Sequence, residues 1–91
     1  MKTIKIEVTE EDIRKGVRDN CRECPIASAC NRAGLKYPSV YPEEIQYWQN
    51  IGLKGWRTSA EVEYWIADYD AGKPVTPFSF EMEIEDGVPS E

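Results

Sequence analysis

Both ends of the chain alternate between apolar and polar side chains, at residues 4–8 and at residues 78–84. The apolar positions are Ile4, Ile6, Val8, Phe78, Phe80, Met82 and Ile84. Because successive side chains of a strand point to opposite faces, this pattern predicts two strands that each bury one face. Opposite charges on their polar faces favour direct pairing of the two strands, with Lys5 near Glu81 or Glu83.

A short helix is expected directly after the first strand. Thr9 can cap its first turn with Asp12 at the third helical position, and the helix dipole favours acidic residues there. Gly16 weakens this helix, which we expect to end near Arg18.

A second helix is expected between Pro25, which suits the first helical position, and Gly34, which suits the C-terminal cap. Its apolar stripe follows the i, i+3, i+4, i+7 spacing and consists of Ile26, Ala29, Cys30 and Ala33. The small side chains of this stripe predict close packing against the sheet or the first helix.

A third helix has the clearest signals. Thr58 and Glu61 have the spacing of a capping box, Gly72 ends the helix, and Pro74 prevents it from resuming. A core-facing stripe is formed by Val62, Trp65, Ile66 and Tyr69.

The middle of the chain gives weaker signals. Each tyrosine of Tyr37-Pro38 and Tyr41-Pro42 precedes a proline and should be extended or turning. Residues 45–48 indicate a strand, 50–52 a turn, and 54–58 the partner strand of a hairpin.

The expected order of elements is therefore β-α-α-β-β-α-β. We predict an α+β fold with a four-stranded, mostly antiparallel sheet and its helices on one face. Residues 1–86 should form a single domain, because 91 residues suffice for one core. Residues 87–91 should form a flexible C-terminal tail.

The net charge of −6 is unevenly distributed. Residues 1–36 contain eight Lys and Arg against six Asp and Glu, whereas residues 37–91 contain three against eleven. The negative total disfavours nucleic-acid binding, which needs a basic face. The acidic part suits a basic protein partner, or is simply a solvated surface. No apolar run reaches the ~18 residues of a membrane span, and the N-terminal residues do not form a signal peptide, so we expect a cytoplasmic protein.

The chain has three cysteines, Cys21, Cys24 and Cys30, and this odd number argues against a secreted disulfide framework. If Pro25 opens the helix, Cys24 is its N-cap and Cys30 lies ~9 Å further along the axis on another face. The three sulfurs then cannot bind one ion, so we expect no metal. A redox role of Cys21 and Cys24 is an alternative, because a thiol at a helix N-terminus should have a lowered pKa.

Catalytic equipment is sparse. The sequence has no histidine, which removes Ser–His and Cys–His catalysis. It also has no Gly-rich phosphate loop. We therefore expect a protein that is not an enzyme and that needs no cofactor.

Two groups of residues are candidates for binding. Arg14, Arg18, Arg22 and Arg32 concentrate positive charge on the first two helices and could hold an anion. The alternative is that they form ordinary surface pairs with Asp12, Asp19 and Glu23.

The second group is aromatic. Five aromatics exceed what a small hairpin buries: Tyr37, Tyr41, Tyr47, Trp48 and Trp56. We expect a protein-binding patch on the open face of the sheet that includes some of Tyr41, Tyr47, Trp48 and Trp56. The alternative is that Trp48 and Trp56 fold back over the sheet edge.

Three motifs resemble those of small proteins of unknown activity encoded by tailed phages and prophages. They are Val8-Thr9-x-x-Asp12-Ile13-x-x-Gly16, Cys24-Pro25-Ile26-Ala27, and Tyr69-Asp70-x-Gly72-x-Pro74-Val75-x-Pro77-Phe78-x-Phe80. Cys21 and Cys30 depart from the pattern of that group. The resemblance implies a phage accessory context and no particular activity.

Two functions follow as expectations. The first is a phage-type accessory protein that binds a host protein in the host cytoplasm, with inhibition of a host defence system as one use. The second is a protein that sequesters a nucleotide signal at an arginine-lined, aromatic-flanked site, for which a homo-oligomer interface is one location.

Overall fold

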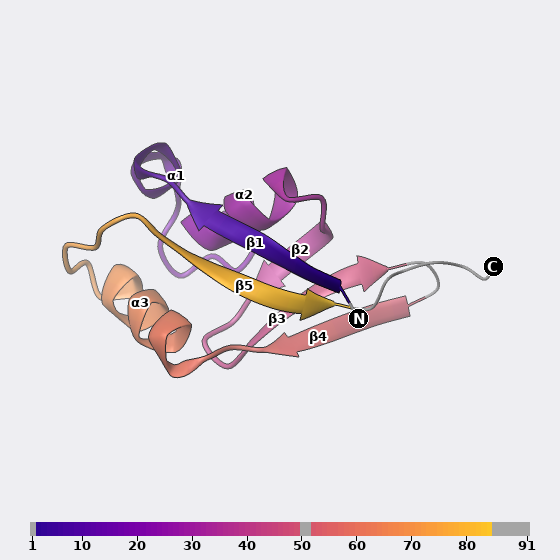
Figure 1. Ribbon diagram of the computed structural model, residues 1–91. Helices are drawn as coiled ribbons and strands as arrows, with labels where there is room; N and C mark the ends of the chain where they lie inside the picture. Colours follow the sequence, from indigo (N-terminus) through magenta and orange to yellow (C-terminus); the bar gives the residue numbers. More distant parts are fainter. Residues whose placement is uncertain (1, 50–51, 85–91) are drawn as a thin grey trace.

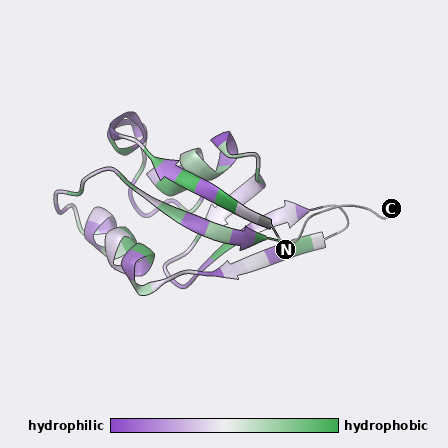
Figure 2. Ribbon diagram, viewed as in Figure 1, coloured by the Kyte–Doolittle hydropathy of each residue, from purple (hydrophilic) through white to green (hydrophobic). Residues whose placement is uncertain are grey.

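The computed structural model describes residues 2–49 and 52–84. Strands β1 (Lys2–Val8) and β5 (Phe78–Ile84) pair antiparallel, and Lys5 lies opposite Glu81. This register confirms the predicted pairing of the two ends of the chain. Figure 2 shows the alternation of apolar and polar residues along both strands.

The middle of the chain forms a second antiparallel sheet with the order β2-β3-β4. Its strands are β2 (Lys36–Val40), β3 (Glu44–Gln49) and β4 (Gly52–Arg57). The predicted single four-stranded sheet is therefore wrong: the described residues form five strands in two sheets. β2 escaped prediction because Pro38 lies inside it. Proline is tolerated at that position because β2 is at the end of the sheet order and its register is irregular between Lys36 and Ser39.

In the described residues three helices lie between strands, and they are labelled in Figure 1. They are α1 (Glu10–Lys15), α2 (Pro25–Arg32) and α3 (Ala60–Asp70). The expectation that helices cover one face of one sheet is corrected, because α2 packs against β1 of one sheet and β2 of the other. α1 packs on α2, and α3 reaches β5 through Trp65, whose ring stacks on Phe78 at 5.0 Å.

The caps explain the ends of the helices. Thr9 and Asp12 form the predicted capping box of α1. α1 ends at Lys15, before the predicted Arg18, and Gly16 that follows is extended. A Cβ on Gly16 would lie 2.6 Å from Cδ of Pro25 and 2.8 Å from Oη of Tyr69, so the chain passes α2 and α3 too closely for a side chain.

The N-cap of α3 is Ser59, whose hydroxyl accepts the amide of Val62 at 3.4 Å. The predicted cap at Thr58 was one residue early, since the hydroxyl of Thr58 instead donates to the carbonyl of Pro42 at 2.6 Å.

One core joins both sheets and two of the helices. Its members include Ile6, Val8, Ile26, Ala29, Cys30, Val40, Ile45, Tyr47, Val62, Ile66, Phe80, Met82 and Ile84. Both sheets, α2 and α3 thus contribute side chains to one core. The tail expected at residues 87–91 and the turn expected at Asn50 lie outside the described residues.

Candidate functional site

The outer face of the β2-β3-β4 sheet carries part of the predicted aromatic patch. Trp48 on β3 lies directly opposite Leu53 on β4, so both side chains point to the same face. Trp48 is 50% exposed and Leu53 is 52% exposed. Lys36 on β2 is the other register partner of Trp48. We call the adjacent side chains of Trp48 and Leu53 the Trp48–Leu53 patch.

The remaining predicted aromatics do not lie on this patch. Tyr47 is in the core and only 3% exposed, because it alternates with Trp48 along β3. Trp56 packs against the core and stacks on Phe80 at 5.6 Å. The expectation that Tyr47 and Trp56 lie on an exposed patch is thus corrected, because Tyr47 belongs to a core shared by residues of both sheets and Trp56 packs against that core. Tyr41 lines a separate cavity.

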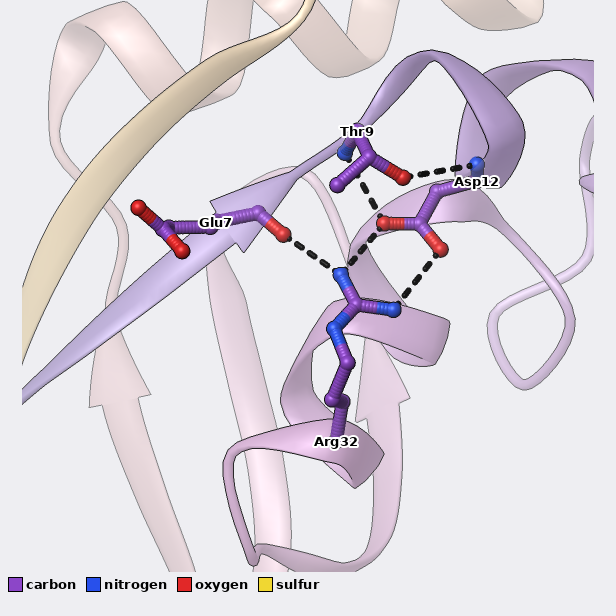
Figure 3. A network of polar contacts seen from close by, with 4 residues as sticks. All are labelled: Glu7, Thr9, Asp12 and Arg32. Atoms are coloured by element: carbon purple, nitrogen blue, oxygen red, sulfur yellow. Dashed lines mark hydrogen bonds and ion pairs between the residues drawn. The ribbon is translucent and has the colours of Figure 1, made fainter.

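Arg32 makes its contacts with α1 and β1 of the same chain. Its guanidinium donates to both carboxylate oxygens of Asp12, at 3.1 and 2.7 Å, and to the carbonyl of Glu7 at 2.7 Å. Figure 3 shows that this carboxylate also accepts the backbone amide of Thr9. Arg32 lowers the pKa of Asp12, with the Thr9 hydrogen bonds adding to the effect and burial opposing it. The pKa of Arg32 is raised by the same pair. Arg32 therefore has a structural role.

Arg14, Arg18 and Lys73 line the same hollow on the surface. This open hollow of about 470 Å³ is bordered by residues of α1 and of the loop after it, by Tyr69 and by the segment from Gly72 to Val75. Arg18 donates through Nε to the carbonyl of Tyr69 at 3.1 Å, and its guanidinium lies 5.6 Å from the centre of the Tyr69 ring. Arg22 is exposed and does not line this hollow. Two of the four predicted arginines are thus brought together.

The cysteines occupy three different environments. The sulfur of Cys24 caps α2 by accepting the amide of Ala27 at 3.4 Å. The expected lowering of its pKa is wrong, because burial raises the pKa despite the helix N-terminus. Burial also raises the pKa of Cys30, to about 12. Cys21 is half-buried. Within the described chain no group of three or more metal-ligand side chains converges.

A cavity of about 370 Å³ lies where the loop after α1 meets α3 and the end of β2. It is lined by Asp19, Asn20, Cys21, Cys24, Ile26, Val40, Tyr41, Pro42, Trp65, Ile66, Tyr69 and Asp70. The backbone amide of Asp19, which has a φ of 56°, donates to the carboxylate of Asp70 at 3.0 Å. Sequence reasoning missed this cavity because its two acidic residues are 51 positions apart. No local spacing could reveal it, although the CxxC motif did mark one wall.

The longest helix in the described part of the chain, α3, has 11 residues, and none of the helices there is long and apolar enough to cross a membrane. Comparisons of the chain with protein-family models, with curated proteins and with solved structures found no significant match.

Proposed function

We propose that this protein acts by binding another protein through the Trp48–Leu53 patch, and that it is not an enzyme. The observation that carries the proposal is the cross-strand pair itself, which leaves a Trp and a Leu about half exposed on the outer face of a sheet. Contiguous exposed apolar side chains of this kind mark interaction surfaces more often than isolated ones do.

The surroundings of the patch resemble an interface rim. Lys36 lies beside Trp48, and the next cross-strand pairs on the same face are Gln46 with Gly55 and Glu44 with Arg57. An apolar centre with polar and charged neighbours is the usual composition of a protein–protein interface, in which buried Trp supplies much of the binding energy.

The nature of the partner follows from charge and from the motif resemblance. Residues 37–91 carry three basic and eleven acidic residues, so a basic partner protein is favoured over a second, equally acidic copy of the chain. The resemblance to phage and prophage proteins makes a host protein in the cytoplasm the proposed partner. Inhibition of a host defence system is the proposed use.

A comparison of three immobilised variants in host lysate tests this proposal. The Trp48→Ala and Leu53→Ala variants should fail to retain the partner that the unchanged protein retains. The loss of binding free energy for each should be roughly 2 kcal/mol or more, as at a hot spot. Tyr64→Ala is the control, because Tyr64 is an exposed aromatic on α3, 71% exposed, outside the Trp48–Leu53 patch.

Retention of the partner by both patch variants would contradict the proposal. Sedimentation of the unchanged protein and the Trp48→Ala variant separates a foreign partner from self-association. A dimer that dissociates in the variant would identify the patch as a contact between copies.

A second candidate function is binding of a phosphate-bearing small molecule such as a nucleotide. The observation in its favour is the hollow on which Arg14, Arg18 and Lys73 lie beside Tyr69, since paired guanidinium groups suit phosphate. Calorimetry with nucleotides should then show binding that Arg14→Gln weakens and Arg22→Gln does not, because Arg22 lies outside the hollow. Equal effects of the two substitutions would contradict a phosphate site there.

A further inference from the structure

The cavity beside α3 differs in chemistry from both surfaces discussed above. Its volume of about 370 Å³ falls in the range of roughly 300–1,000 Å³ that small-molecule sites occupy. Its wall joins segments that are distant in sequence: residues 19–24, residues 40–42 and the last half of α3. The packing of α3 against the rest of the chain therefore creates it.

Much of the cavity wall is apolar. Ile26 and Ile66 are buried in the core beneath it, and Trp65, Tyr69 and Tyr41 add aromatic surface. Trp65 is held in place from two sides: its indole N–H donates to the carbonyl of Thr76 at 2.9 Å, and its ring stacks on Tyr69 at 5.6 Å. Such a wall can accept an apolar stem without first having to reorganise.

The charged groups of the cavity are both negative. Asp19 and Asp70 line it, and no arginine or lysine does. Among the described residues neither carboxylate takes part in a salt bridge, whereas the nearby Asp68 of α3 has Lys73 at 3.9 Å. Arg18 belongs to the other hollow, on which Tyr69 also lies.

From this combination we infer that the cavity binds an organic cation with an apolar stem, an alkylguanidinium or alkylammonium group. The side chains of Arg and Lys have this amphipathic form, with a methylene stem and a charged head. The stem packs on the aromatic wall and the head forms charge-assisted hydrogen bonds with the carboxylates. The inference does not rest on the Trp48–Leu53 patch, because Trp48 and Leu53 do not line the cavity.

The test uses butylguanidine as a probe and butylurea as its neutral isostere. Two readouts follow binding: calorimetry, and the rate at which a thiol reagent alkylates Cys21, which is the half-buried cysteine of the cavity wall. Butylguanidine should bind saturably at millimolar concentration and slow alkylation, and butylurea should do neither. Equal effects of the two probes, or no saturable binding of butylguanidine, would overturn the inference.

The matched variants are Asp70→Asn and Asp68→Asn, which remove the same charge from the same helix. Asparagine at position 70 keeps an oxygen that can accept the amide of Asp19, so the fold should be retained. We expect Asp70→Asn to weaken the binding of butylguanidine roughly tenfold or more, because a charged hydrogen bond is lost. Asp68→Asn should change the affinity less than about twofold. Equal weakening by both variants would overturn the inference, because it would indicate a general charge effect.

A peptide arm distinguishes the two sources of the cation. A capped pentapeptide with arginine between pairs of glycines is compared with the same peptide carrying citrulline, the neutral isostere of arginine. Tighter binding of the arginine peptide than of butylguanidine, abolished by citrulline, assigns the cavity to a basic residue of a polypeptide. Binding of butylguanidine with no binding of the peptide assigns it to a free small-molecule cation.

Discussion

Arg32 on α2 donates two hydrogen bonds, at 3.1 and 2.7 Å, from the two terminal nitrogens of its guanidinium group to the carboxylate of Asp12. The same carboxylate caps α1. The Asp12 side chain is only 7% exposed, whereas that of Arg32 is 52% exposed. The Asp12–Arg32 pair thus joins three elements: Asp12 closes the capping box of α1, and Arg32 links α2 to the end of β1 by donating to the carbonyl of Glu7 (Figure 3). Because the carboxylate is sheltered, this pair should contribute more than an ordinary surface ion pair.

Replacement of Arg32 by Ala should lower the free energy of unfolding by about 1–2 kcal/mol, because Asp12 keeps its Thr9 bonds but loses its charged partner. Arg32→Lys should recover only part of the loss, since an ammonium group cannot make the two-pronged contact. Urea denaturation measures both. Arg14→Ala is the control, expected within about 0.5 kcal/mol of the unchanged protein. A loss as large in the control would show that general charge, not this pair, matters.

The contribution of Asp12 should depend on pH. Its pKa in the folded state lies below its ordinary value of 3.8, chiefly because of Arg32. The stabilisation is therefore fully present above pH 3.8 and is lost as the pH falls through the lower folded-state pKa. Denaturation curves of the unchanged protein and of Asp12→Asn should differ at pH 6 and converge towards pH 2. A difference that persists unchanged at the lowest pH would contradict this assignment.

Trp48 and Trp56 should respond differently to truncation. Trp56→Ala removes a ring that stacks on Phe80 and packs against the core, so it should destabilise by about 2–4 kcal/mol. Trp48→Ala should change stability by less than about 1 kcal/mol, because its side chain is 50% exposed. Thermal melting of the isolated protein separates the two, and similar losses in both variants would place Trp48 in the core instead.

The three thiols should differ in their rates of alkylation. Cys21 is half-buried, whereas Cys24 and Cys30 are buried with raised pKa values, that of Cys30 at about 12. At pH 8 the reactive thiolate of Cys30 should be almost absent from the folded state. Mass spectrometry after alkylation should show one fast modification that Cys21→Ser removes, and two more only in denaturant. Fast modification of Cys30 in the native protein would contradict its burial.

Gly16→Ala should destabilise the protein although Gly16 has a negative φ of −72° that alanine adopts readily. The new methyl group would lie 2.6 Å from the Pro25 ring and 2.8 Å from the Tyr69 hydroxyl. Overpacking of this kind costs about 1–3 kcal/mol. Gly52→Ala is the control, because a Cβ there meets nothing within 4 Å. Equal stability of the two variants in urea would show that the loop after α1 can move aside.

The sequence by itself determined the elements whose signals are local. Period-two alternation predicted β1 and β5 and, with the charges of Lys5 and Glu81, their pairing. The capping box at Thr9 and the proline at the start of α2 predicted where those helices begin. These features depend on residues a few positions apart, whose chemistry is the same in any fold.

Tertiary structure alone decided which apolar and charged side chains of those elements lie in the core, on the surface or at the cavity. Tyr47 and Trp48 are neighbours in sequence, and only the side on which the rest of the core packs against β3 decides that Tyr47 is buried while Trp48 faces outward. Asp19 and Asp70 meet at one cavity only because α3 folds back onto the loop after α1. Burial, and with it the raised pKa of Cys24, depends on contacts between distant segments, which no local spacing encodes.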